Sequence, residues 1–221
     1  ANTVGDDHIE VYADESRSQV LFTYSPLRQQ GEKREGIPNK SLADFIAPKG
    51  QGDDYIGMFA VTAGLGVEKK EKEFQAAHDD YSSIMFKAIA DRMAEAFAEC
   101  LHQRVRKDLW GYVADEALSN EELIAEKYQG IRPAPGYPAC PEHTIKRNMF
   151  EVMQCKEIGM SLTESLAMSP AASVSGFYFA HPQSNYFNLG QIGADQFRAL
   201  QQYSGRDEAE LGRALAPLWS T

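Results

Sequence analysis

Hydrophobic and polar residues alternate in the first of two strand-like stretches near the start of the chain. Residues 8–13 read His-Ile-Glu-Val-Tyr-Ala, and residues 19–25 are rich in residue types that favour strands. The intervening residues 14–18 are polar enough for a turn. This pattern predicts an antiparallel hairpin over residues 8–25.

Glycine and proline interrupt residues 26–54 too often for long elements, so we expect at most a single turn or a brief strand at 42–46. Residues 55–64 then form a nearly continuous apolar run, which predicts a buried strand. The glycines that follow, Gly64 and Gly66, resemble the start of a dinucleotide-binding fingerprint. Its third glycine is replaced by Lys69, so we reject that interpretation.

Good helix formers dominate residues 68–110, which contain no proline and no glycine. The stretch predicts one long helix, or two helices with a break at 78–80 where an aspartate caps the second. Three-four spacing predicts a core stripe of Met85, Ile89, Met93, Ala96 and Cys100. The opposite face carries Ile84, Ala88, Asp91, Glu95, Ala98 and His102. This face is either simply exposed or covered by a ligand or partner.

The C-terminal half alternates between the two kinds of pattern. Ser119 and Glu122 form a capping-box signature for a short helix, and 144–154 is amphipathic with Thr144 as a possible cap. Strand patterns at 173–180 and 186–192 flank a turn, which predicts a second hairpin. Two helices follow, at 194–203 and 208–218.

These elements predict an α+β fold, in which helices flank a mostly antiparallel twisted sheet and one long helix is central. No repeat or obvious linker divides the sequence, so we expect one domain over residues 1–221.

Residues 131–141 contain four prolines, which hold the backbone extended and remove four main-chain donors. We call this segment the ribbon. Arg132 and Ala134 each precede a proline and should project to the same side, where Arg132 offers a planar cation to a carboxylate or phosphate. Gly136 permits positive φ and close approach to the backbone. The alternative is a surface loop with an incidental arginine.

Composition narrows the classes of function. The net charge of −10 disfavours nucleic-acid binding, and no apolar run approaches the roughly 20 residues that span a membrane. We therefore expect a soluble protein with no membrane partner. Three cysteines without paired spacing indicate reduced thiols in the cytoplasm. Cys140 and His143 form an isolated C-x-x-H pair, which is a poor zinc site without a second pair.

The ribbon also carries a family resemblance. Residues 132–144, with 120–124 before them and 172–179 after them, resemble the C-terminal activation domain of cobalamin-dependent methionine synthase. Residues 54–62 and 94–99 are similar to that family too, and the likeness extends from residue 2 to about residue 217. Its most specific part is the spacing of Arg132, Gly136 and Tyr137 within the proline-rich context.

The resemblance implies a domain that binds S-adenosylmethionine and presents its methyl group to cobalamin on a neighbouring domain of the same polypeptide. That methyl group, with an electron from flavodoxin or a related flavoprotein, would reactivate cob(II)alamin in an enzyme that methylates homocysteine. Zinc is expected only elsewhere in the full-length enzyme. We expect no catalytic residue and no methyl transfer by this chain alone.

Matching positions imply individual roles. Arg132 would pair with the methionyl carboxylate and Glu95 with the ammonium group. Asp91 would face the cobalt-ligand histidine of the cobalamin domain. The remaining expected ligand contacts are the backbone at Ala134, Gly136 and Tyr137, and Tyr186 and Phe187.

One departure from the family pattern concerns the start of the domain. The family domain begins with a further helical segment that supplies an acidic ligand contact, so we expect this chain to be a fragment with weakened affinity. Two alternatives stay open. A self-contained methyltransferase lacks support because no glycine-rich turn follows a first parallel strand. A structural docking domain would use the Ala88, Asp91 and Glu95 face without binding a ligand.

Overall fold

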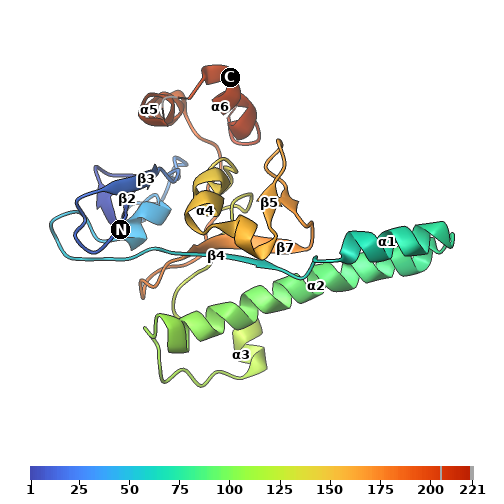
Figure 1. Ribbon diagram of the computed structural model, residues 1–221. Helices are drawn as coiled ribbons and strands as arrows, with labels where there is room; N and C mark the ends of the chain where they lie inside the picture. Colours follow the sequence, from blue (N-terminus) through green and yellow to red (C-terminus); the bar gives the residue numbers. More distant parts are fainter. Residues whose placement is uncertain (205, 220–221) are drawn as a thin grey trace. The chain divides into compact units, whose positions relative to one another are not determined.

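The computed structural model describes residues 1–204 and 206–219, which form two compact units (Figure 1). The first unit comprises Ala1–Gly57, Gly130–Ile145 and the chain from Phe177 onward. The second comprises Met58–Gln129 and Lys146–Gly176. Because both units draw on separate stretches of sequence, no single linker marks the division.

A three-stranded antiparallel sheet opens the first unit. It consists of β1 (Asn2–Val4), β2 (His8–Tyr12) and β3 (Val20–Tyr24) in that order. The pairing of β2 with β3 confirms the predicted N-terminal hairpin. The three residues of β1 are too few to show an alternating pattern, so the sequence did not indicate this strand.

The short element predicted at 42–46 is a single 3-10 turn, η1 (Leu42–Phe45). The Ser41 side chain accepts a hydrogen bond from the Ala43 N–H, and the Asp44 carboxylate accepts one from the Ser41 N–H at 2.8 Å. These two bonds satisfy donors that the start of a helix otherwise leaves open.

Helices α5 (Ala194–Ser204) and α6 (Glu208–Leu215) close the first unit and confirm the last two predicted helices. The Asp207 carboxylate accepts hydrogen bonds from the Ala209 and Glu210 N–H groups and so begins α6. Apolar side chains bury both helices in one cluster, formed by Leu27, Leu189, Ile192, Phe197, Leu211 and Leu215.

The second unit contains two further pairs of strands. Strand β4 (Gly57–Thr62) pairs with β7 (Ser173–Tyr178), and the short β5 (Ser161–Leu162) pairs antiparallel with β6 (Met168–Ser169). Gly57 of β4 and the last two residues of β7 belong to the first unit. The α+β class is therefore confirmed, with the strands divided among three small sheets instead of one.

The helical region predicted at 68–110 consists of α1 (Val67–Ala76) and α2 (Asp80–Arg104), followed by a π-helical turn, η2 (Val105–Leu109). The break lies where predicted, and the Asp79 carboxylate caps α2 by accepting from the Ser82 N–H at 3.0 Å. Within the described residues, no helix has the length and apolarity needed to cross a membrane.

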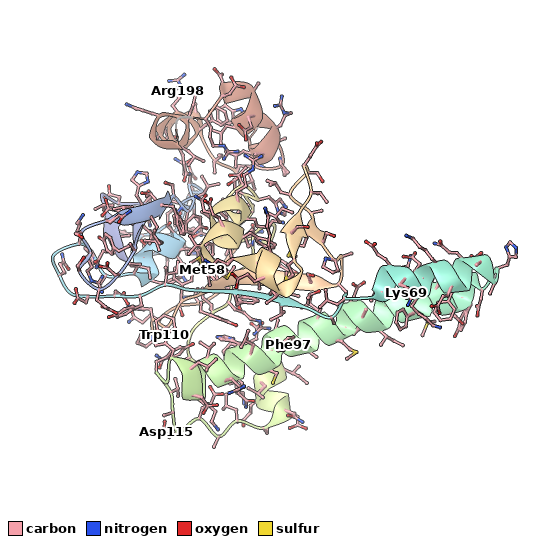
Figure 2. The ribbon with its side chains drawn as sticks, in the orientation of Figure 1. Met58, Lys69, Phe97, Trp110, Asp115 and Arg198 are labelled. Carbon is pink, nitrogen blue, oxygen red and sulfur yellow. The ribbon has the colours of Figure 1, made fainter. Side chains whose placement is uncertain are left out.

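The predicted core stripe of α2 is wrong. Met85, Ile89 and Met93 are 43%, 52% and 60% exposed, and Ala96 and Cys100 are exposed as well. Phe97, labelled in Figure 2, lies on α2 and is 48% exposed. The helix instead buries Ser83, Ala90, Ala94, Ala98 and His102. Apart from His102, the buried residues are small, so the buried face of α2 is not the one with the large apolar side chains.

A buried ion pair follows α2. Arg106 Nε and Nη2 donate to the two Glu116 carboxylate oxygens at 2.6 and 2.7 Å, and the guanidinium lies 4.2 Å from the centre of the Tyr128 ring. The His102 ring meets the same tyrosine edge-on. Burial, reinforced by the charge of Arg106, lowers the pKa of His102 to about 3, so this imidazole is neutral.

Two predicted helices are shorter than expected. Helix α3 (Asn120–Ile124) has the predicted capping box of Ser119 and Glu122. Helix α4 (Lys146–Val152) is followed by a 3-10 turn, η3 (Cys155–Ile158). Thr144 lies two residues before the start of α4 and is not at its cap position; its N–H and hydroxyl donate to the Glu142 carboxylate.

The second predicted hairpin is wrong. Residues 186–192 form no strand, and β7 pairs with β4. The donors of this segment bond elsewhere: Leu189 N–H donates to Pro138 O and Ile192 N–H donates to Leu218 O. Because these main-chain N–H groups already donate elsewhere, they cannot form a ladder of hydrogen bonds with β7.

Candidate functional site

The ribbon lies beside the end of β7 in the first unit. Ile131 and Phe179 exchange two main-chain hydrogen bonds of 3.0 Å, and Phe177 N–H donates to Pro133 O at 2.9 Å. Burial alternates along this part: Ile131, Pro133 and Pro135 are buried, whereas Arg132 and Ala134 are half-buried. This period of two confirms that Arg132 and Ala134 share one side.

The side of the ribbon away from β7 presents Arg132 and Ala134. The Arg132 N–H donates to the phenol oxygen of Tyr186 at 3.0 Å. In the described chain nothing accepts a hydrogen bond from the Ala134 N–H. We call this side, from Arg132 to Ala134, the outer edge. It combines a cationic side chain with a main-chain donor that is available to a ligand.

The ribbon turns back at Gly136. Tyr137 N–H donates to Ala134 O at 3.1 Å, with Pro135 and Gly136 at the two central positions. Gly136 has φ of +102°, as the third residue of a type II turn requires. The Gly136 N–H then donates to Cys140 O at 2.8 Å. The positive φ that the sequence suggested at Gly136 is therefore present.

The other expected contacts of the first unit have distinct surroundings. Tyr137 is 58% exposed, and Tyr186 reaches the outer edge through its hydroxyl. Phe187 packs against the apolar cluster of α5 and α6. A turn precedes Tyr186, held by the bond from Ser184 N–H to His181 O and by Lys40 donating to the Asn185 side chain at 2.7 Å. This turn fixes the position of the backbone immediately before Tyr186.

Cys140 anchors the chain after the turn. Its buried sulfur lies 3.1 Å from the Tyr24 hydroxyl, and the Tyr24 ring stacks on Phe177 at 4.8 Å. Burial raises the pKa of Tyr24 well above its ordinary value. Sequence reasoning missed Tyr24, since nothing local links it to Cys140. Among the described residues no group of three or more His, Cys, Asp or Glu side chains could hold a metal ion.

Glu95 and Asp91 lie on α2 in the second unit, one turn apart. Both side chains are exposed. Of the face predicted around them, Ile84 and Ala88 are also exposed, while Ala98 and His102 are buried. The roles expected for the two carboxylates stay predictions.

A pocket of about 460 Å³ in the first unit contains none of the predicted site residues. Arg28 lines it and pairs with Asp44 at 2.7 Å and with Asp7 at 2.6 Å. The hydrogen bonds that Arg28 donates to Asp44 and Asp7 raise the pKa of Arg28 and keep its charge satisfied. The lining residues come from separate stretches, so no local motif marks the pocket.

Comparison with known proteins places this chain in a family. Residues 1–207 match the family described as the activation domain of vitamin B12 dependent methionine synthase. A crystal structure of the MetH reactivation domain bound to AdoHcy is similar over 100% of this chain and 68% of that chain, with a TM-score of 0.95 and 56% identity. The chain therefore belongs to the activation-domain family of vitamin B12-dependent methionine synthases.

Proposed function

We propose that this chain binds S-adenosylmethionine at the outer edge of the ribbon and presents its methyl group to cobalamin on a neighbouring domain. The observation that carries the proposal is the outer edge itself, where Arg132, the Ala134 N–H and Tyr186 come together beside a tight turn. The AdoHcy bound in the similar crystal structure supports it, because AdoHcy is what S-adenosylmethionine becomes when its methyl group leaves.

The residues of the outer edge fit the amino-acid end of this ligand. A carboxylate is best held by a planar guanidinium and a main-chain N–H, and Arg132 and Ala134 offer one of each. The prolines and the turn at Gly136 fix this part of the backbone before the ligand arrives. Little conformational entropy is then lost on binding.

Further ligand contacts complete the proposal. Glu95 would pair with the ligand ammonium, and the backbone at Gly136 and Tyr137 would line the site together with Tyr186 and Phe187. Asp91 would serve the cobalamin domain instead. Each assignment rests on the family resemblance, and those of Glu95, Asp91 and Tyr186 are tested below.

The chemistry requires no nucleophile or general base from this chain. Bound S-adenosylmethionine would supply an electrophilic methyl group and leave as S-adenosylhomocysteine, and cobalamin on the neighbouring domain, reduced with an electron from flavodoxin or a related flavoprotein, would supply the acceptor. The chain binds and orients the donor. Methylation of homocysteine, and with it methionine biosynthesis in the cytoplasm, belongs to the whole enzyme of which this domain is a part.

Titration calorimetry with S-adenosylmethionine and with S-adenosylhomocysteine tests the proposal. Arg132→Ala should raise both dissociation constants at least about tenfold, because a charged hydrogen-bond pair is lost. Arg132→Lys should recover only part of the loss, since an ammonium cannot form the same fork. Arg34→Ala removes an exposed arginine of the same unit and is the matched control.

The same variants, placed in the full-length enzyme, test the function. Loss of the cob(II)alamin absorption in the presence of S-adenosylmethionine and reduced flavoprotein should slow in Arg132→Ala and not in Arg34→Ala. Normal binding to the cobalamin domain by a protein that binds no S-adenosylmethionine would instead identify a structural docking domain.

A further inference from the structure

His143 lies against the turn of the ribbon. A Cβ atom built on Gly136 would lie 2.9 Å from His143 Nε2 and closer still to Cε1, which is nearer than real Cβ atoms come to a neighbour. The imidazole therefore occupies the volume that a side chain at position 136 would need. Gly136 is required here for two reasons, its positive φ and the presence of this ring.

The segment that carries His143 is fixed on both sides. Glu142 accepts hydrogen bonds from the Thr144 N–H and hydroxyl, so the chain is closed tightly around residue 143. Arg206 Nη1 lies 3.5 Å from the Glu142 carboxylate. Ile145 is buried on one side, and Cys140 is held by Tyr24 on the other. The imidazole is thus mounted on a backbone with little freedom to move.

The turn that this ring contacts determines where the chain runs after Ala134. Ala134 is the first residue of the turn and its carbonyl accepts the closing bond from Tyr137. Rotation at Pro135–Gly136 would therefore move the Gly136–Tyr137 backbone relative to Ala134, whereas the Ala134 N–H belongs to the Pro133–Ala134 peptide, which the bond from Phe177 N–H to Pro133 O holds against β7. An error of about 1 Å in backbone that lines a ligand site can cost a large part of a ligand's binding or reactivity.

We propose that His143 is a positioning residue, whose ring packs against Gly136 and holds the Pro135–Gly136 turn, and thereby the Gly136–Tyr137 backbone that would line the ligand site. The inference rests on the proposed binding of S-adenosylmethionine. It assigns the imidazole a steric role through Gly136 and no contact with the ligand.

Single substitutions of His143 separate the shape of the ring from its nitrogens. His143→Ala should raise the dissociation constant of S-adenosylmethionine about tenfold in calorimetry, while His143→Phe keeps a flat ring and should stay within about threefold of the wild type. His78→Ala, on the connection between α1 and α2, is the control. Unchanged affinity in His143→Ala overturns the proposal. Affinity lost equally in His143→Phe and His143→Ala also overturns it, because that result requires a nitrogen contact.

A double-mutant cycle tests the steric contact without a ligand. Gly136→Ala should lower the unfolding midpoint in urea, and adding His143→Ala should restore part of the loss by removing the clash, leaving the strain of positive φ. Losses that simply add would contradict the contact. The two proposals fail differently: a wild-type chain that binds no S-adenosylmethionine refutes the proposed function, whereas normal wild-type binding with unaltered His143→Ala refutes only the role of His143.

Discussion

The phenol oxygen of Tyr186 accepts a hydrogen bond of 3.0 Å from the main-chain N–H of Arg132. A residue from an irregular segment therefore holds the residue expected to bind the ligand carboxylate. Tyr186→Phe removes only this acceptor. We expect the S-adenosylmethionine dissociation constant to rise about fivefold, since a neutral hydrogen bond contributes about 1 kcal/mol. Calorimetry measures the change.

Tyr81→Phe is the control for this experiment, because Tyr81 is 76% exposed on α2 and lacks this contact. An equal effect of both substitutions on affinity would show that the loss does not arise at Arg132.

Glu95 and Asp91 should differ in their effects on the ligand. Glu95→Gln removes the proposed partner of the ligand ammonium and should weaken S-adenosylmethionine binding at least about tenfold. Asp91→Asn, one turn away, should leave affinity within about twofold and act on cobalamin reactivation in the full-length enzyme. Equal affinities of the two variants would remove Glu95 from the proposed site.

The two faces of α2 can be distinguished by stability. Ala94 is 1% exposed, so Ala94→Leu overpacks a filled space and should lower the free energy of unfolding by about 1–3 kcal/mol. Met93 is 60% exposed, and Met93→Gln should change the free energy of unfolding by less than about 0.5 kcal/mol. Urea denaturation of both variants gives the comparison. The reverse order would restore the core stripe predicted from the sequence.

The buried pair of Arg106 and Glu116 should be costly to break. Glu116→Gln leaves the guanidinium charged and uncompensated, and we expect roughly 3–5 kcal/mol of lost stability in chemical denaturation. Glu73→Gln breaks the half-exposed pair with Lys70 and should cost no more than about 0.5 kcal/mol. Similar small losses of stability in both variants would mean that the Arg106 charge is compensated by groups other than Glu116.

His102 should make the protein sensitive to mild acid. The pKa of His102 is about 3 in the folded protein and 6.5 ordinarily, so between these pH values the unfolded chain binds a proton at His102 and the folded chain does not. Stability is then present above pH 6.5 and is lost as the pH falls from 6.5 towards 3, by up to about 1.4 kcal/mol per pH unit. The slope over this window should be smaller in His102→Asn than in the wild type.

Features with local causes could be predicted from the sequence. The N-terminal hairpin follows from an alternating stretch and a stretch rich in strand-forming residues on the two sides of a polar turn, and the break between α1 and α2 follows from an aspartate at the cap position. The capping box at Ser119 is of the same kind. In each case the residues that determine the structure lie within a few positions of it.

Features with distant causes could not be predicted. The pairing of β7 with β4 joins residues more than a hundred positions apart, whereas a hairpin with 186–192 was the nearer choice. The buried face of α2 was missed for a different reason. Hydrophobic spacing selects large apolar side chains, but the buried residues here, apart from His102, are small.

The candidate site divides in the same way. Prolines at alternate positions imposed the shared side of Arg132 and Ala134, and Gly136 indicated the turn. The support of this site comes from Tyr24, Tyr186 and His143, which reach it through space. No spacing of residues along the chain predicts such contacts.

The ribbon depends on the odd-numbered residues at the end of β7. Phe177 and Phe179 donate their main-chain hydrogens to it, and their rings meet Tyr24 and Phe45. Inserting one residue after Gly176 would reverse this parity, turning both aromatic anchors outward and offering the ribbon the wrong peptide groups. Insertion or deletion of an odd number of residues in this strand should therefore not be tolerated, even where the loops around it accept several extra residues.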